Sequence, residues 1–136
     1  MKFIILFLLF IPAQGFSQKW IEVTKDKFGN KFFINEQALS NDGGVIRIWT
    51  KKVWKKLTDE RGAKPKIYNN VVIKELVEFD CSNYTYKLIS STTYDSSEKR
   101  VIFSDEFSIY LQEWEYVVPE TVGESVLNSV CERFNY

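Results

Sequence analysis

Histidine is absent from this chain of 136 residues, which also has only two cysteines, three prolines and six glycines. Without an imidazole the protein cannot form a Ser-His or Cys-His nucleophile, a His-ligated zinc site or a histidine proton shuttle. Most hydrolase and metalloenzyme mechanisms are therefore excluded. The sequence predicts no catalytic residue, no metal site and no cofactor.

The chain also lacks a charge surplus, because 18 Lys and Arg residues face 18 Asp and Glu residues. A general nucleic-acid binder needs excess cations for its phosphate contacts, so this class is disfavoured. Hydrophobic residues make up 45% of the sequence, which is too many for a disordered chain. Length and composition together predict one compact domain.

The first 17 residues have the features of a secretory signal peptide. Lys2 precedes an uncharged apolar run over residues 3–11, and small residues follow. The run is too short to cross a bilayer and breaks at Pro12, which disfavours an uncleaved membrane anchor. Cleavage after Gly15 or after Ser17 fits the small residues, and we favour Gln18 as the mature start. We therefore expect a signal peptide at 1–17 and a single domain at 18–136.

The two cysteines, Cys81 and Cys131, suggest one disulfide. Export places the chain in an oxidising compartment, where an even number of cysteines favours a bridge over the alternative of two free thiols. Neither cysteine lies near the cleavage site, so no N-terminal cysteine is available for lipid attachment. The mature protein is expected in the periplasm, secreted or at the cell surface, with no lipid anchor and no transmembrane span.

The mature sequence reads mainly as antiparallel strands. Alternating or continuous apolar runs bounded by turn residues predict strands at residues 20–24, 31–34, 45–54, 71–81, 83–94 and 100–104. The run at 45–54 is apolar on both faces, which indicates a central strand. Residues 57–70 contain Gly62 and Pro65 with little periodicity, and they are predicted to form an exposed connection. A short helical start near Val72 is the less favoured alternative.

The C-terminal segment changes to helical periodicity. Thr121 and Glu124 have the spacing of a capping box. The apolar residues that follow fall on one stripe: Val122, Val126, Leu127, Val130, Cys131 and Phe134. The predicted fold is α+β, with a meandering antiparallel sheet of five or six strands. A C-terminal helix docks on the sheet and is tied to it by the disulfide.

The order of several short segments resembles the surface-adhesin E family of small exported bacterial proteins. These segments are Trp20, Phe33 with Ile34, the run from Val45 through Trp49 to Lys51, the run from Glu78 to Cys81, Tyr84 to Ser90, Tyr94, and Trp114 through Val117 to Pro119 before the helix with Cys131. The match spans roughly residues 20 to 131. No single segment is specific to the family. The resemblance rests on the order of the segments along the chain together with the paired cysteines.

The resemblance implies an antiparallel sheet with a helix tied to it by a disulfide. It also implies a non-enzymatic binding role, with host matrix or plasma proteins as partners. This chain lacks the acylated cysteine of the lipoprotein-like members displayed on the outer membrane. The alternative function is a periplasmic structural or envelope-stress component that binds a cell-envelope partner, and a homodimer stays open in either case.

Charge is uneven along the chain, and this suggests a binding surface. Residues 47–66 contain eight Lys and Arg against two acids, whereas residues 105–124 contain six acids and no Lys or Arg. One interpretation is that these two surfaces attract one another or are simply solvated. The other interpretation is that the basic segment at residues 51–56, which we call the basic tongue, binds a polyanion or an acidic protein. The candidate binding residues are Lys51, Lys52, Trp54, Lys55, Lys56, Arg61 and Lys64.

Two further groups of residues have both a functional and a structural interpretation: a pair of carboxylates and the four tryptophans. Glu78 and Asp80 share a strand face at a spacing compatible with a glycosidase pair, but solvated strand faces look the same, so we expect no enzyme. Among the four tryptophans, Trp20, Trp49 and Trp114 are expected in the core, because a small domain needs large apolar anchors. Trp54 lies among charges.

Overall fold

The computed structural model describes residues 18–106 and 112–134, which form eight strands and one helix. The strands are β1 (Trp20–Lys25), β2 (Lys31–Asn35), β3 (Ser40–Asp42), β4 (Val45–Asp59), β5 (Lys66–Asp80), β6 (Thr85–Tyr94), β7 (Val101–Glu106) and β8 (Glu115–Tyr116). The helix α1 spans Val122–Phe134. The predicted signal peptide lies outside the described residues.

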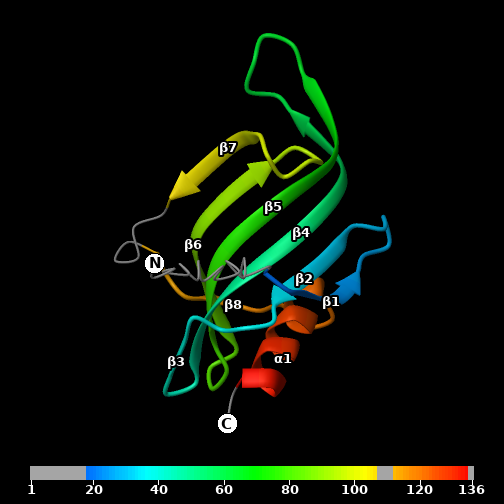
Figure 1. The fold of residues 1–136 in the computed structure, drawn as a ribbon. Helices are drawn as coiled ribbons and strands as arrows, with labels where there is room; N and C mark the ends of the chain where they lie inside the picture. Colours follow the sequence, from blue (N-terminus) through cyan, green and yellow to red (C-terminus); the bar gives the residue numbers. More distant parts are fainter. Residues whose placement is uncertain (1–17, 107–111, 135–136) are drawn as a thin grey trace, which may run out of the picture.

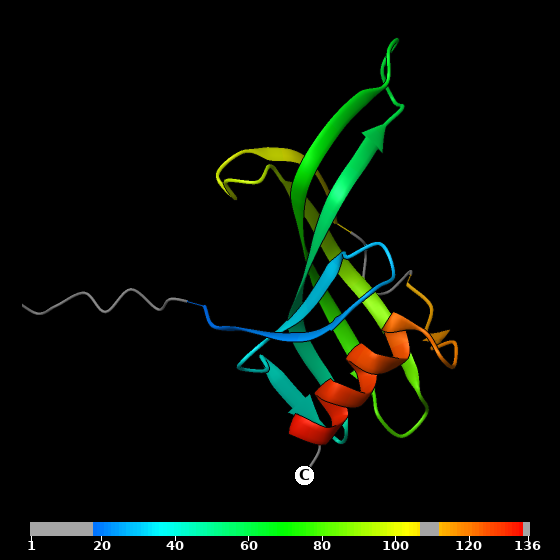
Figure 2. The same cartoon turned by 90° about the vertical axis from the view of Figure 1, so that its right-hand side faces the viewer.

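All eight strands join one antiparallel sheet with the order β1-β2-β4-β5-β6-β7. The short strands β3 and β8 pair with β4 and β6, respectively. The helix α1 lies across one face of the sheet (Figures 1 and 2). The predicted α+β fold is confirmed, and the described strands with no predicted counterpart are β3 and β8, which have three and two residues.

The core lies between α1 and the strands β2, β4 and β5. Side chains alternate between the two faces of a strand, so every second residue of β4 points toward the helix. The buried apolar cluster consists of Phe32, Ile34, Ile46, Ile48, Val77, Phe79, Val126, Leu127 and Val130. The helical stripe expected from the sequence is therefore the surface that docks on the sheet.

The start of α1 is capped, although not as a standard capping box. Thr121 Oγ1 accepts a hydrogen bond from the backbone N–H of Glu124 at 3.4 Å, as expected. The carboxylate of Glu124 accepts instead from the backbone N–H of Glu120 at 2.8 Å, one residue earlier than the box requires. Both contacts satisfy polar groups at the helix start.

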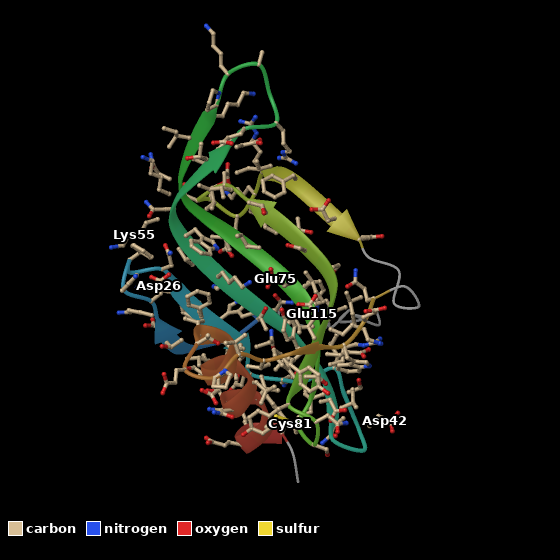
Figure 3. All side chains as sticks on the ribbon, turned by 180° about the vertical axis from the view of Figure 1, so that it is seen from behind. Asp26, Asp42, Lys55, Glu75, Cys81 and Glu115 are labelled. Atoms are coloured by element: carbon tan, nitrogen blue, oxygen red, sulfur yellow. A yellow bond between two sulfur atoms is a disulfide. The ribbon has the colours of Figure 1, made fainter. Side chains whose placement is uncertain are left out.

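Cys81 and Cys131 form a disulfide with their Cα atoms 5.7 Å apart. Cys81 immediately follows β5, and Cys131 belongs to α1. Figure 3 shows Cys81 beside the helix, at the end of the sheet away from the β4–β5 turn. The predicted bridge is confirmed, and the alternative of two free thiols is wrong.

The predicted connection at residues 57–70 is wrong, because most of it is strand. β4 continues to Asp59 and β5 begins at Lys66, so only residues 60–65 connect them. The ladder includes the pairs Thr58–Ile67 and Asp59–Lys66. Figure 1 shows this β4–β5 hairpin projecting beyond all other strands.

Residues 57–70 lack the alternation of apolar and polar residues that indicates a strand, because the projecting hairpin has no buried face. Where solvent reaches both faces, polar residues need not alternate with apolar ones, and period two is lost. The ladder is also interrupted between the pairs Trp54–Val71 and Lys56–Asn69. Asn70 has a φ of 53° at this break, a left-handed conformation that asparagine tolerates better than most residues.

The expectation that three tryptophans serve the core is also wrong. Trp20 and Trp49 are only half-buried and Trp114 is 37% exposed, and none of the three belongs to the buried cluster. The ammonium of Lys51 lies 4.9 Å from the ring centroid of Trp20, and that of Lys87 lies 4.6 Å from the ring of Trp114. Lysine side chains cover these rings in place of a second layer of structure.

Candidate functional site

The end of the β4–β5 hairpin is the first candidate site. β2 stops pairing with β4 at the pair Lys31–Val53, and β6 stops pairing with β5 at the pair Val72–Tyr94. Residues 55–70 therefore extend past both neighbouring strands, and we call them the hairpin extension. Most of the candidate binding residues from the sequence lie in it.

Two of those residues, Lys51 and Lys52, instead lie on the body of the sheet and on opposite faces of β4. The ammonium of Lys51 lies near the rings of Trp20 and Phe33, at 4.9 and 5.0 Å from their centroids. Burial lowers the pKa of Lys51. Lys52 Nζ forms an ion pair with Glu75 Oε2 at 2.8 Å. Both lysines thus have intramolecular partners.

Arg61 lies in the hairpin extension, but its guanidinium already has partners. Its Nε contacts Asp59 Oδ1 at 2.8 Å, and the guanidinium carbon lies 4.1 Å from the ring centroid of Phe103. Hydrogen bonds from Arg61 lower the pKa of Asp59 to about 2. Arg61 therefore contacts Asp59 within the hairpin extension and joins the extension to β7 through Phe103.

The remaining lysines of the hairpin extension are Lys55, Lys56, Lys64 and Lys66, and all four are exposed. None of them forms an ion pair within residues 18–106 and 112–134. The side chain of Lys55 lies across Gly29, so that a Cβ built on this glycine would be 2.5 Å from the ammonium. Lys56, Lys64 and Lys66 are left as cations at the projecting end.

A groove on the α1 side of the sheet is the second candidate site. It has a volume of about 550 Å³ and is lined by residues of β2, β4, β5, β6, β8 and the first turns of α1. Six of its lining residues carry aromatic rings: Phe32, Phe33, Trp54, Phe79, Tyr86 and Tyr116. Trp54 meets Phe32 edge-on with 6.3 Å between ring centroids. Trp54 is thus a groove wall and not part of an exposed basic tongue.

Polar groups converge in the groove. Thr50 is 5% exposed and lines it, and its hydroxyl has no hydrogen-bond partner among the described residues. The Lys52–Glu75 ion pair also lines it, with the Glu75 side chain 14% exposed. Small-molecule and peptide sites commonly combine apolar walls with a few such polar groups.

A carboxylate lies at the β8 end of the groove. Tyr86, which lines the groove, donates its hydroxyl hydrogen bond to Glu115 Oε2 at 2.8 Å. Burial and the neighbouring Glu115 raise the pKa of Tyr86, so the hydroxyl keeps its proton and remains a donor. Figure 3 shows Glu75 and Glu115 on the side of the sheet that carries α1.

Sequence reasoning missed the groove because its residues come from six elements far apart in the chain. One local signal pointed to it. Thr50, Lys52 and Trp54 continue the alternation of the buried Ile46 and Ile48 on the same face of β4. A change from apolar to polar and aromatic residues on a core-facing strand position marks the point where the core ends and an open cavity begins.

The described residues contain no cluster of three or more Cys, Asp or Glu side chains arranged to hold a metal ion. Within residues 18–106 and 112–134, no helix has the length and hydropathy needed to span a membrane.

Comparison with known protein families gives one match. The family model described as Surface-adhesin protein E covers residues 20–132. The matched range begins at β1 and ends within α1, so it includes both candidate sites and both bridged cysteines. No curated protein and no solved structure matches the chain.

Proposed function

The chain belongs to the surface-adhesin protein E family, and from this premise we propose that it is an exported, non-enzymatic protein that binds an extracellular or cell-envelope partner. The family match covers the whole sheet and most of the helix, which supports an adhesin-like role for this domain. The absence of histidine agrees with binding in place of catalysis. The proposed partners are acidic protein surfaces and polyanions.

The observation that carries this proposal is the projecting end of the hairpin. Lys56, Lys64 and Lys66 are exposed there without ion pairs among the described residues. Unpaired ammonium groups on a projecting hairpin are accessible to the sulfate, phosphate or carboxylate groups of a large partner. Lys51 and Lys52 make contacts within the sheet, so they are not among the binding residues proposed here. Lys66 is added to these binding residues.

We expect the variant Lys56→Glu, Lys64→Glu, Lys66→Glu to lose retention on a heparin column. Each lysine that contacts the polyanion releases counterions, so the slope of log affinity against log salt should fall by about one per lysine. The substituted side chains are exposed, and surface substitutions usually change stability by about 0.5 kcal/mol or less. The thermal unfolding midpoint should therefore stay close to that of the wild type.

The matched control reverses three exposed lysines elsewhere, Lys27, Lys31 and Lys99. It changes the net charge by the same amount and should keep most of the heparin retention. Equal loss in both triple variants would show that total charge matters and the hairpin does not. Full retention by the hairpin variant would move the partner site away from the hairpin.

We further propose that residues 1–17 are removed on export. The exported protein should have the intact mass of a chain that begins at Gln18, or at Phe16 for the earlier cut. Recovery of the full-length mass from the membrane fraction would contradict this. Protease treatment of intact cells then separates the two settings: digestion supports surface exposure, and protection supports the periplasmic envelope component.

A further inference from the structure

The helix α1 leaves part of its sheet face uncovered. It packs mainly against β1, β2, β4 and β5, whereas β6 and β8 contribute to the groove beside its first turns. Figure 2 shows α1 crossing one end of the face while the strands continue past it. The six aromatic residues of the groove therefore border a cavity that no described element of the chain fills.

The groove crosses several strands, and this suggests the size of its occupant. β2, β4, β5 and β6 are consecutive in the sheet, so the lining spans three strand spacings. At about 4.8 Å per spacing this is roughly 14 Å, the length of about four residues of extended chain. A short peptide segment matches that length.

The two ends of the groove differ in chemistry. At the β2 side, Phe32 and Trp54 form a corner that Asp26 also lines, and the Asp26 carboxylate already accepts hydrogen bonds from the backbone of Phe28 and from Asn30. At the β8 side, Glu115 lies beside Tyr86. Between the two ends, Lys52 lines the groove, and its ammonium is already paired with Glu75. An occupant with an apolar side chain at one end and a basic side chain at the other is complementary to this arrangement.

Thr50 supplies an independent indication of a ligand. Thr50 is 5% exposed and lines the groove, and its hydroxyl is buried without a partner among the described residues. A buried hydroxyl without a hydrogen bond is unfavourable, and native proteins rarely keep one without reason. A peptide backbone lying along the groove offers both a donor and an acceptor to this hydroxyl.

We propose that the groove binds a short extended segment of a partner protein in which a basic side chain follows an apolar one at a spacing of two residues. Side chains two positions apart in an extended peptide share a face about 7 Å apart, and the length of the basic side chain covers the remaining distance to Glu115. The apolar side chain packs on Phe32 and Trp54, the basic one pairs with Glu115, and the backbone bonds Thr50. This site is separate from the hairpin extension and goes beyond the proposed polyanion binding.

The test uses an acetylated and amidated tetrapeptide of two phenylalanines followed by two arginines, titrated by calorimetry against the mature protein. The counterpart with two glutamates in place of the arginines should not bind. Glu115→Gln should weaken binding about tenfold, because a charge-assisted bond becomes a neutral one. Thr50→Val should weaken it about fivefold, and Thr50→Ser should restore it because the hydroxyl returns.

The matched control is Glu113→Gln, which removes an exposed charge two residues from Glu115; unlike Glu115, Glu113 accepts no hydrogen bond from a described groove residue. It should change the affinity by less than twofold. Thr50→Val should melt at or above the wild-type temperature, since it removes an unsatisfied buried hydroxyl. The triple hairpin variant should bind the peptide as the wild type does, which separates this site from the hairpin.

Three outcomes would overturn the proposal: no binding of the arginine peptide by the wild type, equal binding of the glutamate peptide, or equal losses in the Glu113 and Glu115 variants. Trp54 provides a second readout because it forms a wall of the groove. Peptide binding should change the tryptophan fluorescence of the wild type, and this change should shrink in Trp54→Phe to the part that comes from Trp114 beside Glu115. An undiminished change in Trp54→Phe would place the peptide elsewhere.

Discussion

The double variant Cys81→Ala, Cys131→Ala is expected to unfold with a free energy about 4 kcal/mol below that of the wild type. The disulfide joins residues 50 positions apart, so it closes a long loop in the unfolded chain. Loss of that constraint gives the unfolded state more conformational entropy. For a domain of this size, the expected decrease is a large share of the total stability.

Urea denaturation followed by tryptophan fluorescence measures this difference. The wild type with reductant should approach the double variant without reductant, whereas reductant should leave the double variant unchanged. The circular dichroism of the folded variant should match that of the wild type, because Val126, Leu127 and Val130 still dock α1 on the sheet. A decrease below about 1 kcal/mol would contradict the loop-closure explanation.

The bridge, the helix and the main strands could be predicted because each has a strong local pattern. The helix shows a stripe of apolar residues at helical spacing, and β2, β4, β5 and β6 are each apolar on the face toward the core. Export and an even number of cysteines then left one sensible pairing. These features depend on residue type and spacing, which the sequence displays directly.

The hairpin extension and the tryptophans were mispredicted because tertiary context overrides local pattern there. Thr58 and Ile67 pair in the ladder, yet their stretch has no buried face and therefore no alternation. Trp20 looked like a core residue, but among residues 18–106 and 112–134 no second layer covers its side of the sheet, and Lys51 covers its ring instead. An aromatic residue on a strand indicates burial without indicating on which face.

The sequence shows the basic segment as a run of charges, but which of its lysines are free to meet a partner required the structure. Lys51 and Lys52 are neighbours in sequence, and strand geometry sends them to opposite faces of the sheet. There Lys51 meets aromatic rings and Lys52 meets Glu75. A sequence count adds these charges together, whereas the folded protein offers a partner only the lysines that have no internal contact.

The second large expected effect concerns the docking of α1, which forms both the core and one side of the groove. We expect Leu127→Ala to lower the free energy of unfolding by about 3 kcal/mol, since removing a buried leucine costs transfer free energy and leaves a cavity. Leu127 is fully buried within the cluster that includes Ile34 and Ile48. Urea denaturation under oxidising conditions measures the change with the disulfide intact.

The matched control is Glu132→Ala, a truncation on the exposed part of the same helix that should change stability by about 0.5 kcal/mol or less. Because Val126 and Gly123 line the groove, a loosened helix should also weaken binding of the arginine peptide. Heparin retention should not change, since the hairpin extension makes no contribution to the α1 core. A destabilised variant that kept full peptide affinity would show that the groove does not depend on the position of α1.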